Sequence, residues 1–165
     1  MARSRITDAL DAIRQMISAL RRSSRLTETE FGIGSAQLFV LQQLARAPAR
    51  SINELAARTY THQSSVSVVV RRLVQDGFVE RRQAEDDRRR RELRITRAGQ
   101  RLVDRAPVPA QIKLIDGLRA LPQSDLRTLV RLLDRVVLRM GAAGKSPPML
   151  FTEVSRTTRK RRRRS

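Results

Sequence analysis

Residues 51–95 constrain the fold of this chain more than any other stretch. They begin with Ser51-Ile52-Asn53-Glu54, which matches a capping box. In such a box the serine accepts a hydrogen bond from the amide three residues on, and the glutamate reaches back to the amide of the serine. The match predicts a short helix that ends near Arg58.

A second helix is predicted from Thr61 to Asp76, because Gly77 stands where a helix commonly ends in a left-handed residue. Apolar residues at steps of three and four define its inner face: Val66, Val69, Val70 and Leu73. The outward face comprises Ser64, Val68, Arg71 and Gln75, with Ser65, Ser67 and Arg72 beside it. It is polar and basic except at Val68.

Two short β-prone runs follow this helix, Phe78–Gln83 and Arg91–Ile95, and a charged turn separates them. They favour a β-hairpin. Helix, turn, helix and basic hairpin in this order are typical of a winged helix-turn-helix, whose second helix enters the major groove of DNA. The alternative is a pair of helices that only pack together and leave the polar face in water.

Two groups of residues are therefore candidate DNA contacts. On the second helix, hydroxyls and amides allow close approach to the backbone, and guanidiniums bind phosphates or guanine; the candidates are His62, Gln63, Ser64, Ser65, Ser67, Val68, Arg71 and Arg72. The hairpin turn concentrates positive charge that suits a narrow minor groove; its candidates are Asp87, Arg88, Arg89, Arg90 and Arg91. A charged turn exposed only to solvent is the alternative for the second group.

Net charge supports a polyanionic partner. The chain has a formal charge of +19, of which residues 145–165 contribute +7, so the rest is itself strongly basic. There is no cysteine and only one histidine, which excludes disulfides, thiol switches and zinc–cysteine sites. No catalytic motif is present. We expect no enzymatic activity, no metal and no cofactor.

The flanking segments predict further helices. Residues 5–22 form one amphipathic helix with a single apolar stripe, followed by a polar link from Arg22 to Glu30. Ser35 is expected to cap a helix that stops before Pro48. Thr96 caps a helical stretch to Leu121, broken near Ala106 by two prolines, and Ser124 opens a last helix that ends at Gly141.

The expected fold is mainly α with a small β-hairpin wing, and aromatic residues are so few (3 %) that its core must be aliphatic. We divide the chain into a dimerisation helix and link (1–33), a DNA-binding domain (34–100), dimerisation helices (101–141) and a flexible basic tail (142–165). The tail either docks on phosphates or is simply solvated. No stretch is apolar enough for a membrane span or a signal peptide.

Several segments resemble the MarR family of bacterial transcriptional regulators: INELAART (52–59), SSVSVVVRRLVQDGFVERR (64–82), DRRRRELRITRAG (87–99) and PQSDLRTLVRLL (122–133). The resemblance covers about residues 5 to 141. It implies a triangular homodimer in which the first and last helices of two subunits interleave. The residues expected at that interface are Ile6, Leu10, Ile13, Ile17, Leu20, Leu129, Leu133, Val136 and Val137.

The resemblance also implies two reader helices roughly 34–36 Å apart on a near-palindromic site. Family members often bind small phenolic or aromatic acids between the dimer helices and the reader domain, so a small-molecule effector is a further expected partner. We therefore expect a cytoplasmic, nucleoid-associated regulator, a repressor that binds double-stranded DNA. The alternative is an architectural protein that coats DNA with little sequence preference.

Overall fold

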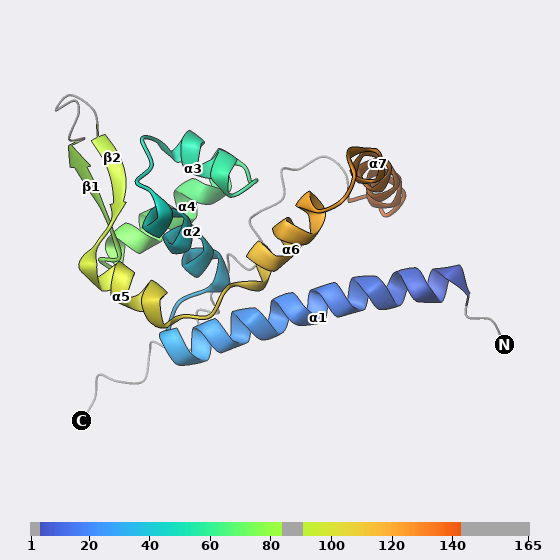
Figure 1. Ribbon diagram of the computed structural model, residues 1–165, viewed down its shortest axis with the longest axis horizontal. Coiled ribbons are helices and arrows are strands. Elements are labelled where there is room, and N and C mark those ends of the chain that lie inside the picture. Colours follow the sequence, from blue (N-terminus) through green and yellow to red (C-terminus); the bar gives the residue numbers. More distant parts are fainter. Residues whose placement is uncertain (1–3, 84–90, 143–165) are drawn as a thin grey trace.

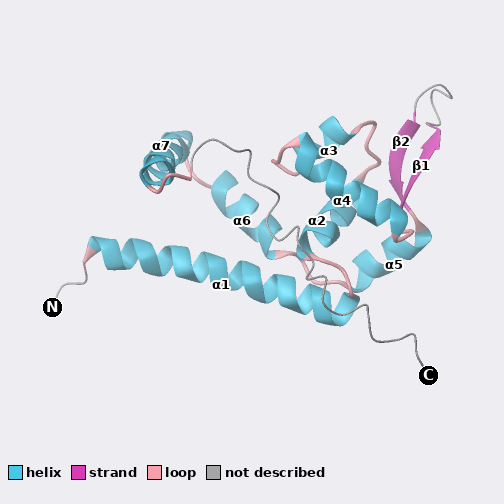
Figure 2. Cartoon of the chain, turned by 180° about the vertical axis from the view of Figure 1, so that it is seen from behind, coloured by secondary structure: helices cyan, strands magenta, loops and turns pink. Residues whose placement is uncertain are grey.

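The computed structural model describes residues 4–83 and 91–142, and it has the predicted fold class (Figure 1). Helices dominate, and one antiparallel hairpin lies at one end of the molecule (Figure 2). The elements are α1 (Arg5–Phe31), α2 (Ser35–Arg46), α3 (Ile52–Arg58), α4 (Gln63–Gln75), β1 (Val79–Gln83), β2 (Arg91–Ile95), α5 (Arg97–Arg105), α6 (Ala110–Arg119) and α7 (Gln123–Arg139). None of the helices within these residues is long and apolar enough to span a membrane.

The hydrophobic core surrounds α2, which packs against α1, α3, α4, α5 and β2. Leu38, Val40 and Leu41 of α2 are completely buried. A helix buried on most sides needs apolar residues around most of its circumference, and α2 meets this requirement. The other elements supply mainly leucine and valine to the same core, so it is largely aliphatic, although Phe39 of α2 is also buried in it.

The hairpin pairs Val79 with Ile95 and Gln83 with Arg91, which confirms both predicted strands. One further pairing was not expected. Ala49, in the loop before α3, exchanges backbone hydrogen bonds of 3.0 and 2.7 Å with Leu93 of β2. This bridge joins the entry of the helix-turn-helix to the base of the wing, and both residues are buried.

The prediction for the first helix was wrong at its C-terminal end. The expected polar link is helical, and α1 continues to Phe31. The polar residues Ser24 and Thr27 face inward and are buried. The Thr27 hydroxyl donates to the carbonyl of Ser23 at 2.8 Å, and the Ser24 hydroxyl donates to Glu28 at 3.1 Å. Small residues whose hydroxyls are hydrogen-bonded can thus lie on the buried face of a helix. Because they are polar, the spacing of apolar residues does not reveal that the helix continues.

Two predicted helix starts also need correction. Gly34, not Ser35, is the N-cap of α2, because the Ser35 hydroxyl is buried and donates to Gln111 Oε1 of α6 at 2.8 Å. Pro122, not Ser124, precedes the first residue of α7. The α4 helix starts at Gln63, two residues later than Thr61. Each shift is small and leaves the order of elements unchanged.

The other predicted caps and breaks are confirmed, with one difference. Ser51 Oγ accepts from the amide of Glu54 at 3.1 Å, but the Glu54 carboxylate accepts from the amide of Arg50 at 2.7 Å. In a capping box the Glu54 carboxylate would accept from the amide of Ser51, so this second hydrogen bond comes from the preceding residue instead. Thr96 caps α5 through the amide of Gly99. The chain breaks between α5 and α6 around the two prolines, as expected.

Candidate DNA-binding surface and dimer arms

The two faces of α4 are separated as the sequence predicts. Val66, Val70 and Leu73 are completely buried, and Val69 is nearly so. The predicted outward residues Ser64, Val68, Arg71 and Gln75 are all exposed, as is Arg72. This amphipathic helix is therefore held to the core by one side and presents hydroxyl, amide and guanidinium groups on the other.

The N-terminal turn of α4 is available to an anion. His62 occupies the N-cap position, is exposed and makes no side-chain capping bond. Free amides at a helix start, together with the helix dipole, favour a phosphate oxygen. Two of the predicted contact residues are less available, because Ser65 and Ser67 are half-buried. The Ser67 hydroxyl also donates to the Ser64 carbonyl at 2.8 Å.

The wing is only partly described. Asp87, Arg88, Arg89 and Arg90 lie outside the described residues, and Arg91 is the first residue of β2. The structure adds two basic residues that the sequence analysis did not select, Arg81 and Arg82, both exposed on β1. Arg82 pairs with Glu80 at 2.8 Å. The run VERRQ carried that signal, since it places adjacent arginines in the first strand of the predicted hairpin.

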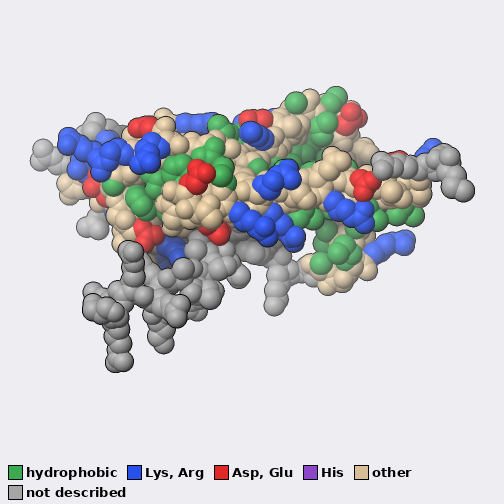
Figure 3. Space-filling model, turned by 90° about the horizontal axis from the view of Figure 1, so that it is seen from below, with side chains coloured by type: hydrophobic (Ala, Val, Ile, Leu, Met, Phe, Trp, Pro, Cys, Tyr) green, Lys and Arg blue, Asp and Glu red, His purple; other side chains and the backbone are tan. Residues whose placement is uncertain are grey.

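Most of the residues expected at a dimer interface are exposed in the single chain. On α1, Ile6 is 72 % exposed, and Leu10, Ile13 and Ile17 are also exposed, whereas Leu20 is buried within its own chain. No residue of α7 is buried, and Leu133, Val136 and Val137 are each 41–52 % exposed. On the face that carries α1, apolar side chains lie open between arginines (Figure 3). Two long apolar stripes therefore lack an intramolecular cover.

A contact between the helix-turn-helix and α6 was missed by the sequence analysis. Tyr60, in the turn between α3 and α4, is the one described non-glycine residue with a positive φ, 52°. Its hydroxyl accepts hydrogen bonds from Nη2 and Nε of Arg119 at 2.9 and 3.3 Å. The hydrogen bond to Tyr60 raises the pKa of Arg119, and nearby Asp116 adds to the shift. An exposed tyrosine in a helix-turn-helix turn was the available signal.

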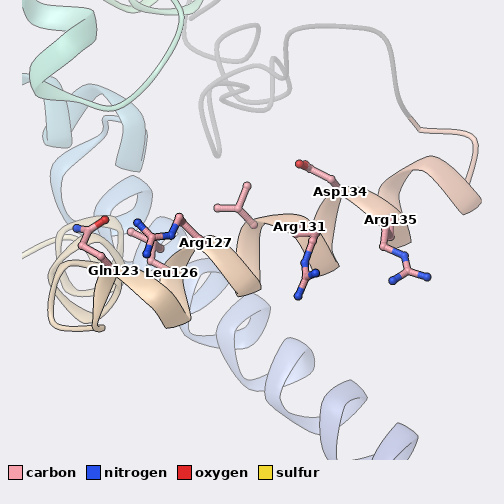
Figure 4. A pocket seen from close by; sticks show the side chains of 7 residues that line it. Gln123, Leu126, Arg127, Arg131, Asp134 and Arg135 are labelled. Atoms are coloured by element: carbon pink, nitrogen blue, oxygen red, sulfur yellow. The ribbon is translucent and has the colours of Figure 1, made fainter.

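Two hollows lie beside the helices with exposed apolar stripes, α1 and α7. One, of about 460 Å³, lies between the end of α1 and α5, and it is lined by Glu30, Phe31, Ala98, Arg101, Leu102, Asp104 and Arg105. The other is an open groove along α7, with Leu126 and Val130 beside arginines (Figure 4). The first combines an aromatic ring with two guanidiniums and two carboxylates, so both charged and apolar groups line it.

Comparison with known proteins agrees with this architecture. Residues 31–90 match the sequence profile of the MarR family. This central segment of the chain is therefore similar to the MarR family. A curated relative, the HTH-type transcriptional regulator BilQ of Clostridium symbiosum, is 33 % identical over 75 residues, which are 46 % of this chain. The match spans about half (52 %) of that relative's length.

Solved structures of MarR-like proteins share the fold over most of the chain. A MarR/EmrR family transcriptional regulator from Acinetobacter sp. ADP1 superposes with a TM-score of 0.54 at 21 % identity, covering 84 % of this chain and 99 % of its own. A probable transcriptional regulator from Pseudomonas aeruginosa gives a TM-score of 0.51 at 25 % identity, covering 80 % and 99 %. The MarR winged helix, with its flanking helices, is thus the architecture of this chain.

Proposed function

We propose that this protein is a homodimeric transcriptional repressor of the MarR family, which reads a near-palindromic operator in the cytoplasm. The observation that carries the proposal is α4: its apolar face is fully buried, and its exposed face presents Ser64, Arg71 and Arg72 together. A helix held in this way fits the width of the major groove, and its side chains reach base edges and phosphates.

Each proposed contact has a separate role. In the reader helix, Arg71 and Arg72 bind guanine or phosphate, and Val68 packs on a thymine methyl. The amides and side chains of Gln63 and Ser64 bind phosphate at the helix start. His62, Ser65 and Ser67 complete this surface. The wing arginines 88–91, with Asp87 orienting them, enter the minor groove.

The dimer follows from the uncovered apolar stripes. In this proposal residues 1–33 and 101–141 hold two subunits together, and residues 34–100 of each subunit read one half of the operator. The α1 stripe and the α7 stripe are each exposed in a single chain, and interleaving two copies buries both. Symmetric pairing then gives two reader helices one DNA turn apart.

Selection of bound sequences from random duplexes tests the proposal. The expected result is enrichment of an inverted repeat with half-sites about 10 base pairs apart. The variant Arg71→Ala should lose the enrichment at one position of each half-site, whereas Arg25→Ala, an exposed arginine of α1, should keep the full motif. Absence of any enriched motif would refute sequence-specific reading.

An effector is proposed for the hollow between α1 and α5. This hollow lies between α1, which is assigned to the dimer, and α5, which follows the wing. A ligand that binds better at one separation of the two reader helices would stabilise that separation. Salicylate serves as the probe, because it is a small aromatic anion. We expect it to weaken operator binding in the wild type, and Arg101→Gln to reduce that effect without changing ligand-free affinity.

A second candidate function is architectural DNA coating, which the charge of +19 favours. Such binding has no preferred sequence and depends steeply on salt. The selection experiment separates the two candidates. Saturating coverage of all duplexes with no enriched motif would establish the architectural function in place of the regulatory one.

A further inference from the structure

A stripe of four arginines runs along α7 and has no role in the proposed operator contact. Arg127, Arg131, Arg135 and Arg139 are spaced by four residues, and all four are exposed. Each step of four advances about 6 Å along a helix and only about 40° around it. The four guanidiniums therefore lie along one side of α7 and cover about 18 Å of its length.

The middle of this stripe faces away from the apolar residues assigned to the dimer, and Leu126 and Val130 border it. Leu129, Leu133 and Val136 lie across the helix from Arg131, because their positions differ from it by more than 120° around the axis. Figure 4 shows Arg131 and Arg135 pointing to the same side, whereas Asp134 points to the other. Within residues 4–83 and 91–142, none of the four arginines forms an ion pair.

The position of α7 keeps the stripe away from the reader. Figure 1, with the longest axis horizontal, shows α7 at the end of the molecule opposite the wing. The α7 helix is therefore not part of the surface formed by α4 and the wing. Four like charges in a row repel one another, and a polyanion relieves that repulsion.

We propose that the arginine stripe of α7 binds the phosphate backbone of a second DNA duplex, so that one dimer holds two duplexes together. The inference rests on the proposed DNA-binding function. All four residues are arginine and none is lysine, and the planar guanidinium fork binds phosphate through two parallel hydrogen bonds. If the apolar side of α7 is covered by the partner subunit, the stripe faces outward.

An anionic membrane is a less suitable partner. Helices that lie on a membrane bury an apolar face that commonly carries tryptophan or phenylalanine. The α7 helix has no aromatic residue, and its apolar face is the one assigned to the dimer. DNA contact leaves that face in the dimer and uses only the arginines.

A duplex-capture assay with the full-length protein tests the inference. One 60-base-pair duplex is fixed to beads, protein is added and washed, and capture of a second, fluorescent duplex is measured. Wild type should capture it. The variant R127Q/R131Q/R135Q/R139Q should capture at least 10-fold less, with first-duplex affinity within about twofold of wild type. The salt slope of capture should fall by about 0.9 for each phosphate that the variant no longer binds.

Two control variants define the result. Replacing the same four residues by lysine keeps the charge, and most of the capture should remain. The variant R5Q/R21Q/R22Q/R25Q removes four exposed arginines from α1 instead, and capture should be unchanged. Should the fourfold glutamine variant fail to fold, judged by circular dichroism, R131Q/R135Q replaces it and should reduce capture at least threefold.

Undiminished capture by the glutamine variants, equal loss in the α1 variant or parallel loss of first-duplex affinity would each overturn the inference. So would a wild type that captures no second duplex but binds phosphatidylserine vesicles through these arginines. Absence of capture by wild type with intact single-duplex binding refutes the second surface alone. Loss of all duplex binding in wild type refutes the proposed function itself.

Discussion

Arg119 Nη2 donates a 2.9 Å hydrogen bond to the Tyr60 hydroxyl, which links the end of α6 to the turn between α3 and α4. The guanidinium carbon of Arg119 also lies 5.1 Å from the centre of the Tyr60 ring, within the range of a cation–π contact. The two residues join the DNA-reading part of the chain to the segment that leads into α7. The contact therefore joins α6 directly to the turn that precedes α4.

The backbone at Tyr60 predicts an order of stability among substitutions. Its φ of 52° is tolerated by asparagine and strained for a β-branched residue. Tyr60→Val should therefore unfold more easily than Tyr60→Asn by about 1–2 kcal/mol in urea denaturation. Neither variant can form the hydrogen bonds with Arg119, so the difference isolates the backbone. Equal stabilities would show that this turn relaxes to a negative φ.

Gly99 allows α5 to pack against the base of the wing. A Cβ atom at this position would contact the carbonyl oxygen of Phe78 and approach Ile95 Cγ1 to 2.8 Å. Gly99→Ala should destabilise the protein by about 1–3 kcal/mol in thermal or urea unfolding. The matched control is Gly117→Ala in α6, where nothing lies near the added methyl and alanine should stabilise by about 0.5–1 kcal/mol. Destabilisation of both by the same amount would contradict the packing argument.

Glu54 makes stability depend on pH. Burial acts to raise the pKa of Glu54, but hydrogen bonds from the Arg50 amide and the Arg58 guanidinium, with the charges of both arginines, lower it overall. A carboxyl whose pKa is lower in the folded state stabilises the fold above its unfolded pKa, about 4.3, and loses this contribution as pH falls through the folded pKa. The advantage of wild type over Glu54→Gln should shrink as the pH falls below about 4.3 and through the lower pKa of the folded state.

Chemical denaturation at a series of pH values measures this difference. Glu30→Gln, a substitution on the exposed end of α1, controls for the loss of a carboxylate elsewhere. A constant difference between wild type and Glu54→Gln across the whole range would rule out the proposed contribution of ionised Glu54.

Leu133 and Leu138 of α7 offer a matched test of the proposed dimer. They are five residues apart, so they point about 140° away from each other around the helix. Leu133→Asp places a charge in the apolar stripe and should give monomers in sedimentation, with operator affinity at least 100-fold lower because the two half-sites are no longer bound together. Leu138→Asp should remain dimeric. Dimerisation of both variants would remove the α7 stripe from the interface.

Val68 is 52 % exposed in the middle of the reader helix, where a contact with a thymine methyl group is proposed. Val68→Ala should lower the preference for thymine at one position of each half-site by about fourfold for each methyl group that makes contact. Replacing that thymine by deoxyuridine should have the same effect on wild type. The two changes together should cost no more than either alone, and additive losses would exclude a direct contact.

The winged helix could be predicted because its signals are local. Capping residues and valines at helical spacing mark α3 and α4, and Gly77 marks the end of α4. The errors came from polar residues that tertiary packing buries. Ser35 reads as a cap, but its hydroxyl is buried and bonded to Gln111. Thr27 reads as a link residue, but it is buried against the body. Burial of such polar residues depends on tertiary packing, which the periodicity of apolar residues does not record.

The exposed face of the candidate site could also be predicted from local sequence signals. The outward face of α4 follows from the helical repeat, and the structure leaves its arginines exposed. The contact of Tyr60 with Arg119 was not predictable, because it joins residues 59 positions apart through an unusual backbone angle. The inward turn of the Ser67 hydroxyl likewise depends on local hydrogen bonding that the sequence leaves open.

The unbroken length of α1 determines how a dimer of this chain can change shape. The helix has 27 residues and is therefore roughly 40 Å long. Its C-terminal half is fixed to its own body through Ser24 and Thr27, and its N-terminal half carries the stripe assigned to the partner. Such a rod transmits rotation but cannot stretch. In the proposed dimer, a signal that alters the spacing of the two readers would therefore pivot each reader about the end of this helix. A small tilt at the partner's side would then become a larger displacement at the DNA.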